Sequence, residues 1–134
     1  MIKIGQEVHM RSACIFLVED DPEVVFAVNR LLSHGSHEIV LWVSNLKDAL
    51  AAIAGGRLED RAVDVAIVDA NFPEKAGEQS NISGGPIVAE AIRAASPHVK
   101  IIAFSDDPEE TASYGDIHVN KVNSTNLLRK ISVL

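Results

Sequence analysis

The sequence predicts an α/β fold, in which a parallel β-sheet is covered by helices on both faces. Short, mostly apolar runs alternate along the chain with segments whose apolar residues repeat at helical spacing. Parallel strands need long crossover connections, and helices of this kind supply them. The chain has 134 residues, of which 47% are hydrophobic. This length and hydrophobicity suit one domain with a single core and argue against disorder.

The predicted strands are five short runs, the pattern of strands buried between two helical layers. In chain order they are residues 14–18 (CIFLV), 38–43 (EIVLWV), 63–68 (VDVAIV), 100–104 (KIIAF) and 117–120 (IHVN).

The segments that follow the first two strands carry helix signals. Asp21 can cap the first helix, because Pro22 then falls at the first helical position, where a missing N–H does no harm. Gly35 can end this helix. Ser44 or Asn45 can cap the second helix. Later in the chain, residues 86–95 and 125–133 have apolar residues at helical spacing, and a short helical piece can follow Pro108.

Composition and charge narrow the class of protein. The net charge of −7 and the pI of about 5.1 argue against binding to a phosphate backbone, which needs a stripe of Lys and Arg. No segment is long and apolar enough to span a bilayer. The single cysteine, Cys14, excludes a disulfide framework and favours a reducing cytoplasm. Residues 1–13 lack a signal-peptide core and are interpreted as a leader or arm before a domain at residues 14–134.

Chemically active side chains gather just after the strands. Ligands of parallel α/β sheets bind beyond the carboxyl ends of the strands, so these residues should meet at one edge. They are Glu19, Asp20 and Asp21 after the first strand, Asp69 and Asn71 after the third, Ser105 after the fourth, and Lys121 after the fifth.

Several carboxylates at one edge require a cation. Two unit charges about 4 Å apart repel by roughly 4 kcal/mol at an effective dielectric constant near 20. Mg²⁺ suits such a site because it takes one or two carboxylates and accepts phosphate oxygens. A lysine offers a charge to a phosphoryl oxygen, and an Asp carboxylate can accept a phosphoryl group as a nucleophile. Taken singly, Asp69 and Lys121 could be surface residues, and Ser105 or Asp21 could cap a helix; for Asp21 the cap is the favoured interpretation.

With these residues at the strand ends, the sequence resembles the receiver domain of two-component response regulators, over residues 14 to about 133. The resemblance depends on four motifs at strand ends, in the order of the family: LVEDDP, VAIVDANFP, IIAFSD and HVNK. It implies a flavodoxin-like, doubly wound parallel sheet of five strands in the order 2-1-3-4-5. It also implies a phosphorylation-dependent signalling module with no turnover of outside substrates, whose partners are a histidine kinase or phosphotransfer protein and an output protein.

The resemblance further implies roles for single residues. Glu19 and Asp20 would hold Mg²⁺, while Asp69 would bind the metal and accept the phosphoryl group. The remaining implied roles are a backbone carbonyl ligand at Asn71, a phosphoryl-bonding hydroxyl at Ser105 that moves on activation, a phosphate-pairing amine at Lys121, and a switch side chain at His118, which could equally be a packed ring.

The sequence departs from the family pattern in four places. The polar, glycine-bearing loop at residues 74–84 is long, and we expect it to be mobile. The segment between Ser105 and Lys121 is short, so we expect a shortened fourth helix. Asp106 takes a position usually given to Ala or Gly, and Val122 replaces a proline. Because a cis bond before valine costs about 2.5–4 kcal/mol, we expect a trans Lys121–Val122 bond with the amine still directed to Asp69.

Two alternatives remain open. Asp106 and Val122 favour a degenerate receiver that binds proteins without phosphorylation. A phosphatase with an Asp nucleophile, similar to haloacid dehalogenase-like proteins, is disfavoured because Asn71 stands where those enzymes need a second Asp. We expect a receiver without an output domain in this chain, either a stand-alone regulator or a piece of a longer protein.

Overall fold

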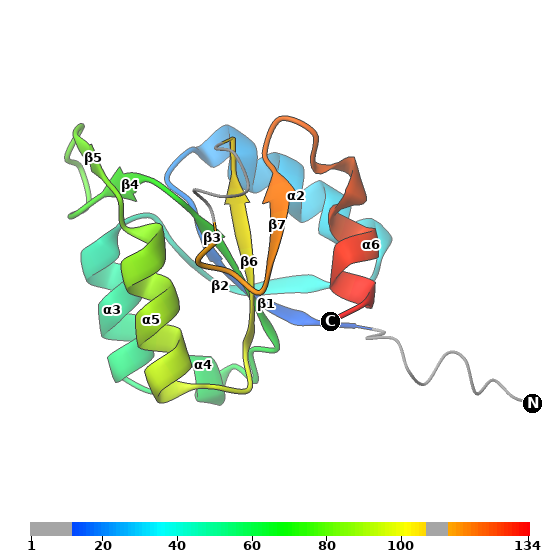
Figure 1. The fold of residues 1–134 in the computed structure, drawn as a ribbon, viewed down its shortest axis with the longest axis horizontal. Coiled ribbons are helices and arrows are strands. Elements are labelled where there is room, and N and C mark those ends of the chain that lie inside the picture. Colours follow the sequence, from blue (N-terminus) through cyan, green and yellow to red (C-terminus); the bar gives the residue numbers. More distant parts are fainter. Residues whose placement is uncertain (1–11, 107–112) are drawn as a thin grey trace, which may run out of the picture.

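A computed structural model describes residues 12–106 and 113–134. Its centre is a five-stranded parallel sheet with the strand order β2-β1-β3-β6-β7 (Figure 1). The strands are β1 (Cys14–Val18), β2 (Glu38–Val43), β3 (Val65–Asp69), β6 (Lys100–Ser105) and β7 (Ile117–Asn120). Numbered along the chain within this sheet, the order is 2-1-3-4-5, so the predicted flavodoxin-like topology is confirmed.

Helices cover both faces of the sheet (Figure 1). One face carries α2 (Pro22–His34) and α6 (Leu127–Ser132), and the other carries α3 (Leu46–Ala54), α4 (Arg57–Asp60) and α5 (Gly85–Ala95). Each face has its own apolar cluster: Leu32 packs with Ile67 on the first face, and Val88 packs with Val68 on the second. Because adjacent residues of a strand point to opposite faces, β3 supplies both cores and is buried along its whole length.

The predicted helix starts are confirmed by their capping bonds. The Asp21 carboxylate accepts a hydrogen bond from the backbone N–H of Glu23, with Pro22 at the start of α2. The Asn45 side chain accepts one from the N–H of Asp48 at the start of α3. Each bond satisfies a donor that the first turn of a helix leaves free.

Several element bounds differ from the sequence prediction. The third strand begins at Val65, two residues later than predicted, and the Asp64 carboxylate before it accepts a hydrogen bond from the N–H of Cys14. The short helix α4 was not predicted; it follows Gly56, which adopts a left-handed conformation with φ of 76°. The last helix is preceded by a 3₁₀ turn at Ser124–Asn126. The expected fourth helix falls mostly on residues 107–112, which lie outside the described residues.

The loop at residues 74–84 was expected to be mobile, but it belongs to a short antiparallel hairpin. Strands β4 (Phe72–Pro73) and β5 (Asn81–Ile82) pair with each other at the carboxyl end of the sheet (Figure 1). The carbonyl oxygen of Glu74 also accepts a hydrogen bond from the N–H of Lys47 in α3. The strand pairing and this bond anchor the two ends of the segment beside the strand ends.

The edge strand β2 has an irregularity. The register of β1 with β2 shifts between Ile15 and Phe16, and Val40 is passed over in the pairing. The guanidinium of Arg61 donates to the carbonyl oxygen of Val40 at 3.0 Å. A charged side chain therefore occupies part of the open edge.

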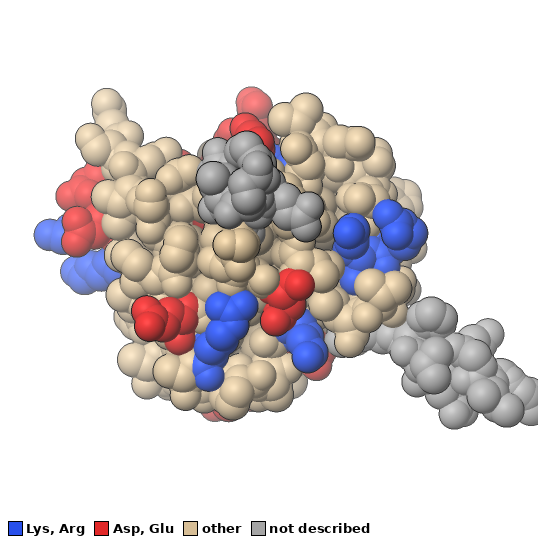
Figure 2. Space-filling view, viewed as in Figure 1, with Lys and Arg blue, Asp and Glu red and all other residues tan. Residues whose placement is uncertain are grey.

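The surface carries both signs of charge. Figure 2 shows Lys and Arg side chains interspersed with Asp and Glu over the described residues of the viewed face. Over residues 12–106 and 113–134, no helix has the length and apolar character that crossing a membrane requires.

His37 generates a prediction about stability and pH. Its ring is buried, and Nδ1 accepts a hydrogen bond from the N–H of Ala13, while burial lowers the pKa of the ring. The unfolded chain therefore takes up a proton more readily than the folded one. As pH falls from about 6.5, the usual histidine pKa, the free energy of unfolding should fall until the lower folded pKa is passed.

Urea unfolding at pH 7.5 and 5.5 measures this effect. The variant His37→Asn keeps a side-chain acceptor without titrating in this range, so its stability should change less between the two pH values. His34→Asn, at an exposed histidine of α2, is the control and should behave as the parent. Equal pH dependence in the parent and His37→Asn would contradict the prediction.

Candidate functional site

A cavity of about 330 Å³ lies at the carboxyl ends of the strands. Six of the seven residues predicted to act in a site line it, and His118 is the exception. The lining consists of Glu19, Asp20, Asp21, Asp69, Asn71, Asn81, Ser105, Asp106 and Lys121. Side chains from four strand ends of the main sheet and from the β4–β5 hairpin therefore meet in one place.

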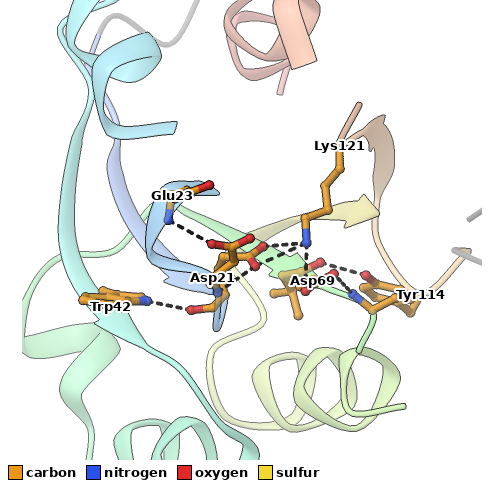
Figure 3. A network of polar contacts seen from close by, with 9 residues as sticks. Asp21, Glu23, Trp42, Asp69, Tyr114 and Lys121 are labelled. Atoms are coloured by element: carbon orange, nitrogen blue, oxygen red, sulfur yellow. Dashed lines mark hydrogen bonds and ion pairs between the residues drawn. The ribbon is translucent and has the colours of Figure 1, made fainter. Parts of the chain in front are cut away.

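Lys121 connects the two most buried carboxylates. Its Nζ lies 3.1 Å from Asp69 Oδ2 and 3.0 and 3.2 Å from the two carboxylate oxygens of Glu19 (Figure 3). Glu19 is completely buried and Asp69 is 5% exposed. One ammonium group thus compensates part of the charge of two carboxylates at the ends of the adjacent strands β1 and β3.

The pKa values follow from this crowding. Burial, with a further contribution from the charge of Asp69, raises the pKa of Glu19 to about 7, although Lys121 opposes the shift. Burial also raises the pKa of Asp69, again against the effect of Lys121. Burial disfavours the charged amine of Lys121, but Asp69 and Glu19 outweigh it and raise its pKa. For both carboxyl groups, burial thus outweighs the attraction of Lys121 and favours the neutral form relative to an exposed acid.

The carboxylates are also arranged to hold a divalent cation. One oxygen each from Glu19, Asp20 and Asp69 lies within 4.8 Å of the other two. In addition, Glu19 Oε1 is buried and has no hydrogen-bond partner of suitable geometry among the described residues. A small cation that binds oxygens at about 2.1 Å needs ligands roughly this close and would satisfy the buried oxygen. The donor set of hard oxygens fits such an ion.

Neighbouring strands hold the acidic turn in place. The indole N–H of Trp42 in β2 donates to the carbonyl oxygen of Glu19 at 2.8 Å (Figure 3). The N–H of Glu19 donates to the carbonyl oxygen of Val43, also in β2. The N–H of Asp21 donates to the Glu19 carboxylate. Sequence reasoning did not single out Trp42, whose role depends on the pairing of β1 with β2.

Tyr114 was also missed. Its hydroxyl donates to the carbonyl oxygen of Val68, one residue before Asp69, at 2.7 Å (Figure 3). A Cβ added at Gly85 would lie 2.9 Å from the Tyr114 ring, so a glycine is needed where α5 begins. Tyr114 thereby fixes the β6–β7 connection against the strand that ends at Asp69.

The Lys121–Val122 peptide bond is trans, as predicted. The Asn120 side chain accepts hydrogen bonds from the N–H groups of Val122 and Asn123 and forms the turn in place of a proline. The N–H of Lys121 bonds the carbonyl of Ser105. These bonds direct the lysine toward Asp69.

Ser105 and His118 lie differently with respect to the cavity. Ser105 is buried at the end of β6 and lines the cavity. His118 lies on β7, and its neighbour Val119 is buried in the core on the α2 side, so alternation puts His118 on the α5 side. Its Nε2 atom is buried without a hydrogen-bond partner among the described residues.

Comparisons with known proteins support the fold. No protein-family model and no curated protein sequence matches the chain. Among solved structures, a signal receiver domain of an HD domain-containing protein from Pseudomonas fluorescens Pf-5 is similar with a TM-score of 0.69 and 20% identity, over 91% of this chain and 85% of that one. The signal receiver domain of NarL from Mycobacterium tuberculosis gives a TM-score of 0.67 and 21% identity, over 90% and 93%.

A DNA-binding response regulator of the LuxR family from Staphylococcus aureus has a TM-score of 0.67 and 22% identity, over 89% of this chain and 95% of that one. The chain thus has the fold of response regulator receiver domains, as the four sequence motifs predicted. At these levels of sequence identity, the similarity to the solved structures is evidence for the fold alone.

The ion pairs of Lys121 generate a prediction. In Lys121→Met, Glu19 and Asp69 face each other without a counter-charge. At pH 8 the free energy of unfolding should fall by about 1–3 kcal/mol, the cost of leaving buried polar groups unsatisfied. At pH 5.5, below the pKa of Glu19, a proton replaces the lost charge and the loss should be smaller. Lys100→Met, at an exposed lysine, is the control for urea unfolding. An equal loss at both pH values would contradict the electrostatic explanation.

Proposed function

We propose that this protein is a signalling receiver that accepts a phosphoryl group on Asp69 in a Mg²⁺-dependent reaction. The observation that carries the proposal is the contact of the Lys121 amine with Asp69 and Glu19, at the end of two adjacent buried strands. A structural ion pair would need only one carboxylate for one lysine. Here the carboxylates of Glu19, Asp20 and Asp69 outnumber the single ammonium group, and a divalent cation would balance their remaining charge.

The proposed reaction is a transfer between two nucleophiles. A carboxylate oxygen of Asp69 attacks the phosphorus of a phosphorylated histidine, the new P–O bond forms, and the P–N bond breaks with its electron pair passing to the imidazole. Lys121, which already contacts Asp69, then pairs with a phosphoryl oxygen, and the Ser105 hydroxyl donates a hydrogen bond to another. When bound at Glu19, Asp20, Asp69 and the carbonyl of Asn71, Mg²⁺ supplies positive charge to the phosphoryl oxygens.

The proposed partners follow from this chemistry. A histidine kinase or phosphotransfer protein in the cytoplasm donates the phosphoryl group, and an output protein recognises the modified receiver. Ser105 and His118 are the proposed switch residues, because one lines the cavity and the other lies on the adjacent strand. The protein promotes its own modification and turns over no outside substrate. Against the degenerate alternative, the lysine amine remains directed to Asp69 despite Val122.

Phosphorylation by a small donor tests the proposal. Acetyl phosphate with Mg²⁺ should add one phosphoryl group to the parent, and Asp69→Asn should remain unmodified because an amide oxygen is a poor nucleophile. Intact-mass measurement gives the result directly. Asp60→Asn, at an exposed acid of α4, is the matched control and should be modified like the parent. An unmodified parent would favour the degenerate receiver, and a modified Asp69→Asn would assign the chemistry to another residue.

Mg²⁺ binding gives a separate prediction. An ion that binds the folded chain alone stabilises it, by about 2.7 kcal/mol at a concentration 100 times Kd. Thermal melting should therefore shift upward at millimolar-scale Mg²⁺, and Asp20→Asn should reduce the shift. Because Trp42 is the sole tryptophan and bonds the carbonyl of Glu19, its fluorescence should change during the titration. An equal melting response in the parent and Asp20→Asn would remove Asp20 from the metal site.

A further inference from the structure

The β4–β5 hairpin brings Asn81 to the wall of the cavity that holds Asp69. We propose that Asn81 is a catalytic residue for hydrolysis of the phosphoryl group on Asp69, because its side-chain amide holds the attacking water. This inference rests on the proposed function. The proposal concerns the lifetime of the phosphorylated state, which is distinct from its formation.

The hairpin is held firmly enough to position a side chain. Phe72 of β4 is fully buried, and a Cβ at Gly84 would lie only 2.5 Å from its ring, so the chain returning from β5 packs directly on this ring. On the opposite side, the carbonyl of Glu74 accepts the hydrogen bond from Lys47. The strand pairing between these anchors fixes the backbone of Asn81 opposite Pro73.

The other residues of the cavity wall are less suited to hold a neutral water. Glu19, Asp20 and Lys121 belong to the charged cluster around Asp69. The Asp21 carboxylate caps α2, and Asp106 carries a charge that repels an anionic phosphoryl group.

Asn71 carries a neutral amide like Asn81, but its Oδ1 atom accepts a hydrogen bond from the hydroxyl of Ser83 at 3.5 Å. Asn81 combines a donor and an acceptor without charge, and no hydrogen bond from another described residue occupies its side chain. It can therefore accept a hydrogen bond from the water with Oδ1 and donate one to the water oxygen through its NH₂ group.

The geometry of displacement decides where the attacking water must approach. The attacking and leaving oxygens lie roughly in line across the phosphorus, so water must approach from the side opposite Asp69. Asp69 is buried at the strand end, while Asn81 is an exposed residue of the same cavity wall, so its amide is placed to contact a water that enters from solvent. The water oxygen forms the new P–O bond and the bond from phosphorus to the Asp69 oxygen breaks, leaving a carboxylate. The phosphate product and solvent take up the protons of the water.

The test measures decay of the phosphorylated protein. The parent, Asn81→Ala and the control Ser80→Ala, whose residue is exposed beside β5 and does not line the cavity, are modified with acetyl phosphate and Mg²⁺. After removal of the donor, intact mass follows loss of the phosphoryl group. Asn81→Ala should lose it about two- to tenfold more slowly, the range expected for one lost hydrogen bond, and Ser80→Ala should match the parent. Mg²⁺ titrations read by Trp42 fluorescence should give the same affinity for all three proteins.

Each other outcome has a defined meaning. If the parent takes up no phosphoryl group, the proposed function fails and this inference fails with it. Phosphorylated parent and Asn81→Ala proteins that decay at equal rates would overturn the inference alone. Faster decay of Asn81→Ala would also overturn it, since Asn81 would then shield the phosphoryl group. If Asn81→Ala also bound Mg²⁺ more weakly, its slower decay would be assigned to a structural role of Asn81. If Asp106→Asn decayed more slowly than the parent while Asn81→Ala did not, Asp106 would be the residue that holds the water.

Discussion

The close approach of Glu19 and Asp69 is the constraint on which the site depends. The two carboxylates come from adjacent strands, and both are almost fully buried. A buried charge lowers the stability of the folded state unless an opposite charge or hydrogen bonds compensate it. Lys121 follows β7, which is separated from β3 by β6, and its side chain reaches back to both carboxylates. The strand order of the sheet therefore brings the amine to Glu19 and Asp69. Burial raises the pKa values of both acids although Lys121 lies beside them, so one ammonium group does not offset the cost of burying two carboxylates.

The local structure around this cluster keeps the carboxylates from separating. The backbone carbonyl of Val43 and the indole N–H of Trp42, both in β2, hold the turn after β1, and the hydroxyl of Tyr114 holds the end of β3. These groups bond main-chain atoms, so they do not compete with Lys121 for the carboxylate oxygens. The same sheet that makes the core thus supplies a rigid frame for a set of mutually repelling charges.

Sequence patterns could predict the strands and the residues that follow them. A fully buried strand is a continuous apolar run, so its end is visible as the first acid, as at Glu19 and Asp69. The position of Asn45 as a helix cap was visible for similar local reasons. The β4–β5 hairpin was not visible, because strands of two residues carry no periodicity. The contacts of Trp42 and Tyr114 depend on register and on the path of a connection, which no local pattern encodes.

The bond from Arg61 to the carbonyl of Val40 has a consequence for how the chain meets other chains. An edge strand with free backbone groups is a template onto which a foreign strand can add, and such addition leads to aggregation. Here the irregular pairing and the guanidinium disturb one edge of the sheet, while the strand at the other edge, β7, has only four residues. Strand addition is discouraged at both borders. The helices and loops are therefore the surfaces on which contact with another chain would not extend the sheet.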